Sequence, residues 1–179
     1  MKHTDNSYLR DKVDLRIEHL PPGPVSVLDC YSGKGLIWAA VKRISGRSIT
    51  VLPIDKRAEK LDFHLHGDNI HYLSTLNLSR FNVIDLDAYG VPFEQIQTLV
   101  NRGYKGTVFV TFIRTVVGNL PHKMLERIGF TKAMINKVPT LFARRGWEYF
   151  LEYLATIGVR QIHYRSAKHR KHYLAFTLA

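Results

Sequence analysis

Short apolar runs alternate with segments of helical spacing along most of the chain. Apolar runs that predict strands cover residues 25–29, 49–54, 63–66, 81–87, 106–112, 161–166 and 173–178. Apolar residues recur at helical spacing in residues 7–20, 36–44, 93–101 and 140–157, which predicts four helices, and a shorter helical stretch is expected after residue 54. This alternation predicts an α/β fold with a doubly wound, mostly parallel sheet.

Right-handed crossovers place the carboxyl ends of all parallel strands at one edge of such a sheet, and ligands bind at that edge. The first predicted helix stops at Pro21 and Pro22, so residues 1–24 form a helical entry segment. The chain has no internal repeat, low-complexity tract or linker, and we expect residues 1–179 to form a single domain. The last two strands are joined by the short basic turn AKHRKH.

Composition and charge limit the size of the core, the kind of partner and the cellular compartment that can be expected. With 45% hydrophobic residues, 179 residues are enough for one core. The net charge of +11 favours a polyanionic partner, although a basic, solvated surface is the simpler alternative. Cys30 is the one cysteine, which excludes an intramolecular disulfide and favours a reducing compartment. The N-terminus lacks the apolar core of a signal peptide and no stretch is long enough to span a membrane, so we expect a cytoplasmic protein.

The segment VSVLDCYSGKG, residues 25–35, is an apolar strand that ends in an acid and turns through two glycines. Gly33 and Gly35 allow the backbone to approach a ligand without a side-chain clash. Asp55 ends the next strand, where a carboxylate accepts hydrogen bonds from ribose hydroxyls. No GxGxxG run exists, which argues against a dinucleotide enzyme. A strand-turn-helix in some other α/β protein is the alternative.

Asp29, Gly33, Gly35 and Asp55 resemble the cofactor pattern of class I S-adenosylmethionine-dependent methyltransferases. The resemblance implies a Rossmann-like fold with an antiparallel C-terminal strand, and S-adenosylmethionine as cofactor. It implies that Asp55 binds the ribose and that Asp29 acts on the loop or on the amino-acid part of the cofactor. Tyr31 stands where many such loops have glycine, as in the LDxFxGxG variant of several nucleic-acid methyltransferases.

Two further segments carry the resemblance. Asp68, in the segment HGDN, stands where the family contacts adenine, although an ordinary loop turn is equally natural there. The segment FNVIDLDAYGVP, residues 81–92, resembles the fourth motif of tRNA guanine exocyclic-amine dimethyltransferases, with Ala88 in place of that family's proline. That family's larger C-terminal domain has no counterpart in this sequence.

The second of these segments carries the predicted chemistry. The lone pair of an exocyclic amine is conjugated into the base, so an acceptor for the amine hydrogens redirects it toward the methyl group. The resemblance makes Asp87 that acceptor and Tyr89 the residue that stacks on an unstacked base. Asp85 lies two residues earlier, on the same side of the strand, where it contacts the cofactor or orients the loop. Alternatively, the two acids cap the next helix and Tyr89 packs as an ordinary aromatic.

The resemblance also implies a basic surface beside this site, because in the methyltransferase topology the turn between the last two strands emerges on the ligand-binding edge. The residues expected to contact nucleic acid are Arg114, Arg165, Lys168, Arg170 and Lys171. A basic turn that keeps a sheet edge soluble is the alternative for any one of them. His64, His66 and His71 lack the acidic or cysteine partners of a tetrahedral set, so no metal site is expected.

These observations predict a methyltransferase that transfers a methyl group from S-adenosylmethionine to an exocyclic amine of a base in RNA or DNA. A protein side chain or a small molecule is the alternative substrate. A cofactor-binding or nucleic-acid-binding module without catalysis is the alternative of a different class. A protein partner is one candidate source of specificity.

Overall fold

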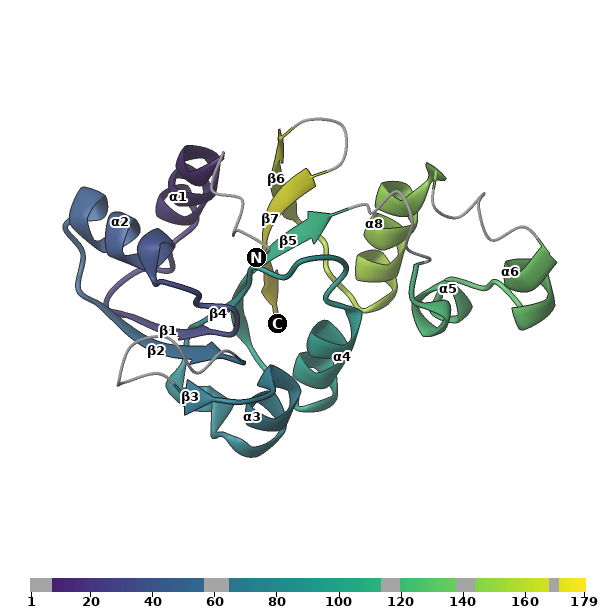
Figure 1. The fold of residues 1–179 in the computed structure, drawn as a ribbon, viewed down its shortest axis with the longest axis horizontal. Helices are drawn as coiled ribbons and strands as arrows, with labels where there is room; N and C mark the ends of the chain where they lie inside the picture. The colour runs from purple at the N-terminus through teal and green to yellow at the C-terminus, as the bar shows by residue number, and fades with distance from the viewer. Residues whose placement is uncertain (1–7, 57–64, 114–119, 138–143, 168–170) are drawn as a thin grey trace.

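The computed structural model describes residues 8–56, 65–113, 120–137, 144–167 and 171–179. Its centre is a seven-stranded sheet (Figure 1). The strands are β1 (Val25–Asp29), β2 (Ile49–Asp55), β3 (Leu65–His66), β4 (Val83–Leu86), β5 (Gly106–Ile113), β6 (Ile162–Ala167) and β7 (Lys171–Leu178).

The strands lie in the order β3, β2, β1, β4, β5, β7, β6. β1 to β5 pair in parallel, whereas β7 runs antiparallel to both β5 and β6. The predicted α/β fold, with a doubly wound and mostly parallel sheet and an antiparallel C-terminal strand, is confirmed. The carboxyl ends of β1, β2, β4 and β5 form one edge, here called the carboxyl rim. Lys171, the first residue of β7, pairs with Ile113 at this rim.

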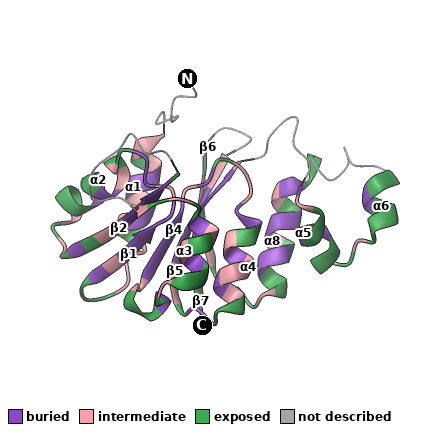
Figure 2. Ribbon diagram, turned by 60° about the horizontal axis from the view of Figure 1, so that its bottom comes forward, coloured by how far each residue is buried: buried purple, intermediate pink, exposed green. Residues whose placement is uncertain are grey.

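Helices cover both faces of the sheet (Figure 2). On one face lie α1 (Leu9–Glu18) and α2 (Leu36–Ser45), which contact each other. On the other face lie α3 (Asn69–Thr75), α4 (Phe93–Asn101) and α8 (Gly146–Thr156). The short helices α5 (His122–Arg127) and α6 (Lys132–Lys137) continue the second layer beyond α8, and residues Leu78–Arg80 form a 3-10 turn. None of the described helices has the length and apolar character needed to cross a bilayer.

Alternate residues of the central strands enter different cores. Val27 and Val83 pack with α1 and α2, whereas Leu28 and Ile84 pack with the layer of α4 and α8. Because side chains alternate along a strand, a strand buried on both faces needs a continuous apolar run. This explains why β1 and β4 are recognisable in the sequence. All four of these side chains are fully buried.

The element boundaries differ from the sequence predictions in understandable ways. The strand predicted over 81–87 is observed as Val83–Leu86. Just before it, the amide side chain of Asn82 accepts from the N–H of Ser26 and donates to the carbonyl of Pro24. The helix predicted over 140–157 is observed as Gly146–Thr156, and residues 138–143 lie outside the described part of the chain. The single domain over 1–179, with 1–24 as an entry segment, stays a prediction.

Candidate active site at the carboxyl rim

The loop between β1 and α2 has the backbone shape that its glycines predict. Gly33 and Gly35 adopt φ values of 52° and 68°, in the left-handed region that side chains disfavour. The N–H of Gly33 donates to Oδ2 of Asp55 at 2.9 Å, so the end of β2 holds the loop in place. A Cβ added at either glycine would meet no atom within 4 Å. The space beside the loop is therefore open to a ligand.

Asp29 and Asp85 form a buried pair of carboxylates. The two residues are partners in the register of β1 and β4, and their exposed fractions are 5% and 1%. Oδ1 of Asp29 accepts a long hydrogen bond of 3.3 Å from the N–H of Tyr31. Burial and repulsion by Asp85 raise the pKa of Asp29 well above its ordinary value. Asp29 is thus the acid of the site whose charge is least compensated.

The carboxylate of Asp85 is held by groups from two helices. Nε and Nη2 of Arg16, on α1, donate to its two oxygens at 2.7 Å each. The indole N–H of Trp38, on α2, donates to Oδ2 at 2.7 Å. Arg16 is itself buried, and its Nη1 donates to the carbonyl of Lys12. Although burial lowers the pKa of Arg16, the attraction of Asp85 outweighs it and the pKa is raised. Asp85 therefore fixes α1 to the rim.

The carboxylate of Asp87 is engaged in the same way. Nζ of Lys12 lies 2.8 Å from Oδ1 and 2.7 Å from Oδ2, and the Thr111 hydroxyl donates to Oδ1. The side chains of Lys12 and Asp87 are only 8% and 9% exposed. Burial raises the pKa of Asp87, but attraction to Lys12 and Arg16 and the hydrogen bonds from Lys12 and Thr111 lower it by more, so the net shift is downward. Asp87 therefore stays ionised at neutral pH.

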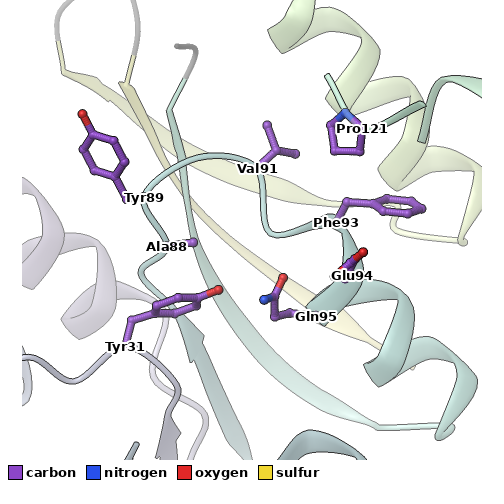
Figure 3. Close-up of a pocket in the computed structure, with 8 residues that line it drawn as sticks. All are labelled: Tyr31, Ala88, Tyr89, Val91, Phe93, Glu94, Gln95 and Pro121. Atoms are coloured by element: carbon purple, nitrogen blue, oxygen red, sulfur yellow. The ribbon is translucent and has the colours of Figure 1, made fainter. Parts of the chain in front are cut away.

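Tyr31 and Tyr89 line a hollow of about 380 Å³ at the rim, here called the rim pocket. Its walls are Tyr31, Ala88, Tyr89, Val91, Phe93, Glu94, Gln95 and Pro121 (Figure 3). Burial raises the pKa of Tyr31 to about 12, so its phenol keeps its proton. Tyr89 points away from the other lining side chains and is 77% exposed. The alternative that Tyr89 packs as a core aromatic is not what the structure shows.

The segment HGDN forms the start of α3. Oδ1 of Asp68 accepts from the N–H of Ile70 and so caps the helix, while Oδ2 lies 2.7 Å from Nζ of Lys56. The hydrogen bond from Lys56 is the main cause of the lowered pKa of Asp68. The neighbouring Asn69 is buried, donates to the carbonyl of Cys30 and accepts from the amide of Gln95. Asn69 thus connects the glycine loop to α4, a role that the sequence did not indicate.

The residues predicted to contact nucleic acid fall into three groups. Arg114, Lys168 and Arg170 lie outside the described residues. Arg165 faces α1, where its guanidinium lies 2.5 Å from Glu18, 3.6 Å from Asp14 and 3.8 Å from Asp11. Lys171 lies at the carboxyl rim next to Ile113, whose N–H donates to the carbonyl of Gly90 in the loop that carries Tyr89. Of this set, the described structure brings Lys171 to the predicted site.

Two other chemistries find little support in the described residues. Cys30 is a buried free thiol whose pKa is raised by burial and by the nearby Asp29 and Asp85. A thiolate nucleophile is therefore disfavoured at neutral pH. Within the described ranges, no three His, Cys, Asp or Glu side chains are grouped so that they could hold a metal ion.

Sequence comparison identifies no relative: no protein-family model matches the chain, and no curated protein sequence matches it. Solved structures with the same fold are numerous.

A 1,6-didemethyltoxoflavin-N1-methyltransferase from Burkholderia thailandensis, solved with S-adenosylhomocysteine, matches with a TM-score of 0.58 and 13% identity over 98% of this chain and 80% of its own. A SAM-dependent methyltransferase from Aquifex aeolicus matches with a TM-score of 0.55 and 12% identity over 98% of this chain and 94% of its own. Another SAM-dependent methyltransferase, from Archaeoglobus fulgidus, matches with a TM-score of 0.52 and 12% identity over 93% of this chain and 92% of its own. The fold of this chain is therefore that of class I methyltransferases.

The buried carboxyl of Asp29 predicts a pH-dependent loss of stability. An acid with a raised native pKa is protonated more readily in the folded chain than in the unfolded chain, so folding becomes less favourable as the pH rises above the ordinary value of 3.8. We expect Asp29→Asn to unfold at a higher temperature than the wild type at pH 7, with a difference that shrinks toward pH 4. Thermal unfolding by circular dichroism measures this. The exposed variant Glu152→Gln should show no such trend, and a difference that grows on acidification would contradict the assignment.

The pair of Arg16 and Asp85 predicts a large loss of stability on breaking it. Arg16→Met leaves a buried carboxylate with Trp38 as its remaining side-chain donor, and removal of one partner of a buried pair costs about 3–5 kcal/mol. Urea unfolding measures the change. The double variant Arg16→Met with Asp85→Asn has no buried charge at this position and should recover part of the loss. If the double variant is no more stable than Arg16→Met, the loss does not come from the unpaired carboxylate.

Proposed function

We propose that this chain is an S-adenosylmethionine-dependent methyltransferase that acts on an exocyclic amine of a base in RNA or DNA. The observation that carries the proposal is the position of the rim pocket. Tyr31, from the glycine loop, and Ala88 with Tyr89, from the loop after Asp87, line the same hollow. These two loops are the segments expected to bind the methyl donor and the methyl acceptor. A shared pocket is what direct transfer between them requires.

The donor side fits the proposed cofactor. Gly33 and Gly35 leave open space beside the loop, and the buried Asp55 ends β2 next to it. Oδ2 of Asp55 holds the loop, and we assign the carboxylate to the ribose hydroxyls as well. Asp29 is assigned to the charged amino-acid part, which would compensate its buried charge, and Asp68 with Tyr31 to the adenine side. Asp85 orients the loop, since its two oxygens already accept from Arg16 and Trp38.

When bound, S-adenosylmethionine supplies a methyl group to the attacking nitrogen while the carbon–sulfur bond breaks with its electron pair on sulfur. Asp87 is the proposed acceptor for an amine hydrogen. Its lowered pKa makes it a weak base, so we assign it hydrogen-bond acceptance, and the proton of the methylated nitrogen goes to solvent. Tyr89, exposed at the pocket mouth, is the proposed stacking partner of the base.

A nucleic acid as substrate is supported by charge and by position. The net charge of +11 favours a polyanion, and Lys171 lies at the carboxyl rim beside the loop of Tyr89. Arg114, Lys168 and Arg170 remain part of the proposed surface. Arg165 contributes less in our proposal, because three carboxylates of α1 surround its guanidinium.

A small heterocyclic amine is the second candidate substrate. The rim pocket, at about 380 Å³, falls within the range of small-ligand sites, which is about 300–1,000 Å³. The 1,6-didemethyltoxoflavin-N1-methyltransferase with the same fold acts, by its name, on a small molecule. Methylation of nucleosides or free heterocycles without methylation of polymers would favour this candidate.

Cofactor binding is the first prediction from this proposal. Calorimetric titration should give micromolar affinity for S-adenosylmethionine and S-adenosylhomocysteine, about −8 kcal/mol. Asp55→Asn should bind at least about tenfold more weakly, a loss of about 1.4 kcal/mol, because an amide nitrogen cannot accept from the ribose hydroxyls. Glu152→Gln, which removes an acid on the exposed side of α8, is the matched control. Absence of binding by the wild type would refute the proposed cofactor.

Stacking by Tyr89 predicts a second result. Tyr89→Ala should reduce transfer of a tritiated methyl group from S-adenosylmethionine to RNA or denatured DNA, whereas Tyr89→Phe should retain most of it, because the ring and not the hydroxyl stacks. Loss of one stacking contact of about 1–3 kcal/mol corresponds to roughly 5- to 150-fold in kcat/KM. Since Tyr89 is 77% exposed, thermal stability should stay unchanged. Equal activity of Tyr89→Ala and wild type would remove Tyr89 from the site.

A further inference from the structure

Lys12 is a buried lysine from outside the loops of the site. It lies on α1, 75 residues before Asp87 in the chain, and its ammonium contacts both oxygens of that carboxylate. The ammonium also lies 5.3 Å from the centre of the Tyr173 ring on β7. A lysine is rarely this buried without a specific partner. The partner here is the acid to which the amine is assigned.

The spacing of the charges explains how α1 reaches the site. Lys12 and Arg16 are four residues apart, which is about 6 Å along a helix. Asp85 and Asp87 are two residues apart, which is about 6.6 Å along a strand. These two distances are nearly equal. Lys12 and Arg16, on one face of α1, can therefore contact Asp87 and Asp85 at the same time. Since Lys12 meets Asp87 and Arg16 meets Asp85, α1 runs antiparallel to β4.

The pairing leaves Asp87 with a defined acceptor position. A carboxylate has about four sites for hydrogen bonds. Among the hydrogen bonds of the described residues, Oδ1 accepts from Lys12 and Thr111, and Oδ2 accepts from Lys12. The remaining site is on Oδ2. The whole side chain keeps only 9% of its surface exposed, so a ligand has little room to reach it.

We propose that Lys12 is a positioning residue of the methyl transfer: it holds the Asp87 carboxylate charged and oriented, with one acceptor site on Oδ2 directed to the amine. This inference rests on the proposed function. Arg16 has a different task, because its side chain donates to Asp85 and to the carbonyl of Lys12, not to Asp87. The N-terminal helix thereby becomes part of the active site without touching substrate.

The charged and titratable groups around Asp87 determine the pH range in which its carboxylate is ionised, and therefore the pH dependence expected for methyl transfer. Lys12 and Arg16 on α1 favour its charged form, while Asp29 and Asp85 carry the same charge as Asp87. Thr111 on β5 donates to it, and Tyr173 on β7 lies under Lys12. Loss of Lys12 leaves Arg16 and Thr111 to favour ionisation against burial and the two acids, so the pKa of Asp87 should rise. Asp87 would then be protonated over a wider range of pH and would lose its acceptor function there.

The test compares Lys12→Met and Lys12→Arg with wild type, using tritiated S-adenosylmethionine and the RNA or denatured DNA pool that the wild type methylates, from pH 6 to 9.5. We expect Lys12→Met to lower kcat about tenfold or more near pH 6.5, with partial recovery at high pH, as Asp87 ionises. Lys12→Arg should stay close to wild type. The calorimetric affinity for S-adenosylhomocysteine should change little. Lys132→Met, on the exposed side of α6, is the control for loss of one lysine.

A double-mutant cycle separates positioning from folding. If Lys12 acts through Asp87, the variant with both Lys12→Met and Asp87→Asn should be no slower than Asp87→Asn alone. Lys12→Gln, which keeps a donor but no charge, replaces Lys12→Met in the cycle if that variant does not fold. A folded Lys12→Met with wild-type kcat and pH profile would overturn the inference alone. A wild type that neither binds S-adenosylhomocysteine nor methylates either pool overturns the proposed function and this inference together.

Discussion

Two buried acids that lie side by side in a sheet repel each other when ionised, so a cation from the helix layer that covers them is needed to balance the charge. Asp29 and Asp85 are register partners on β1 and β4, and both are buried. Arg16 supplies the cation and Trp38 a further donor. At about 4 Å and an effective dielectric constant of 20, two opposite charges attract by about 4 kcal/mol, which is similar to the effective cost of taking ions out of water. The pair therefore adds little net stability. What it specifies is the place of α1, and from that place follow the contacts of Lys12 with Asp87 and of Arg165 with the outer acids of the helix.

The two halves of the rim are also connected on the opposite face. The glycine loop contacts α3 through the hydrogen bond from Asn69 to the carbonyl of Cys30, and α3 contacts α4 through the bond from Gln95 to Asn69. Gln95 lines the rim pocket. A displacement of the loop by a ligand would therefore reach the pocket wall through two side-chain hydrogen bonds. The site is supported by α1 and α2 from one side and by α3 and α4 from the other.

Much of the fold was predictable, because the buried strands carry continuous apolar runs and the glycines mark the loop after β1. The placement of Asp85 and Asp87 on one side of a strand end also followed from the sequence. Their partners did not. Lys12 and Arg16 stand in a helix of mostly polar sequence, where charged residues are normally solvated. The sequence feature that could have indicated the pairing is the spacing: Lys12 and Arg16 are four residues apart in a helix, and the two acids are two residues apart at a strand end, which gives similar distances. Arg165 was predicted from the local basic cluster, whereas its environment is set by Asp11, Asp14 and Glu18, which lie about 150 residues earlier in the chain.

The pairing of Arg16 with Asp85 has a consequence for biosynthesis. The two residues are 69 positions apart, and α1 is synthesised long before the strand that receives it. Chains grow at about 5–20 residues per second, so the helix waits on the order of 3–14 seconds for its carboxylate partners. During that time Lys12 and Arg16 have no carboxylate partner from this strand end. The docking of α1 at the carboxyl rim therefore depends on a strand end that is synthesised 69 residues later.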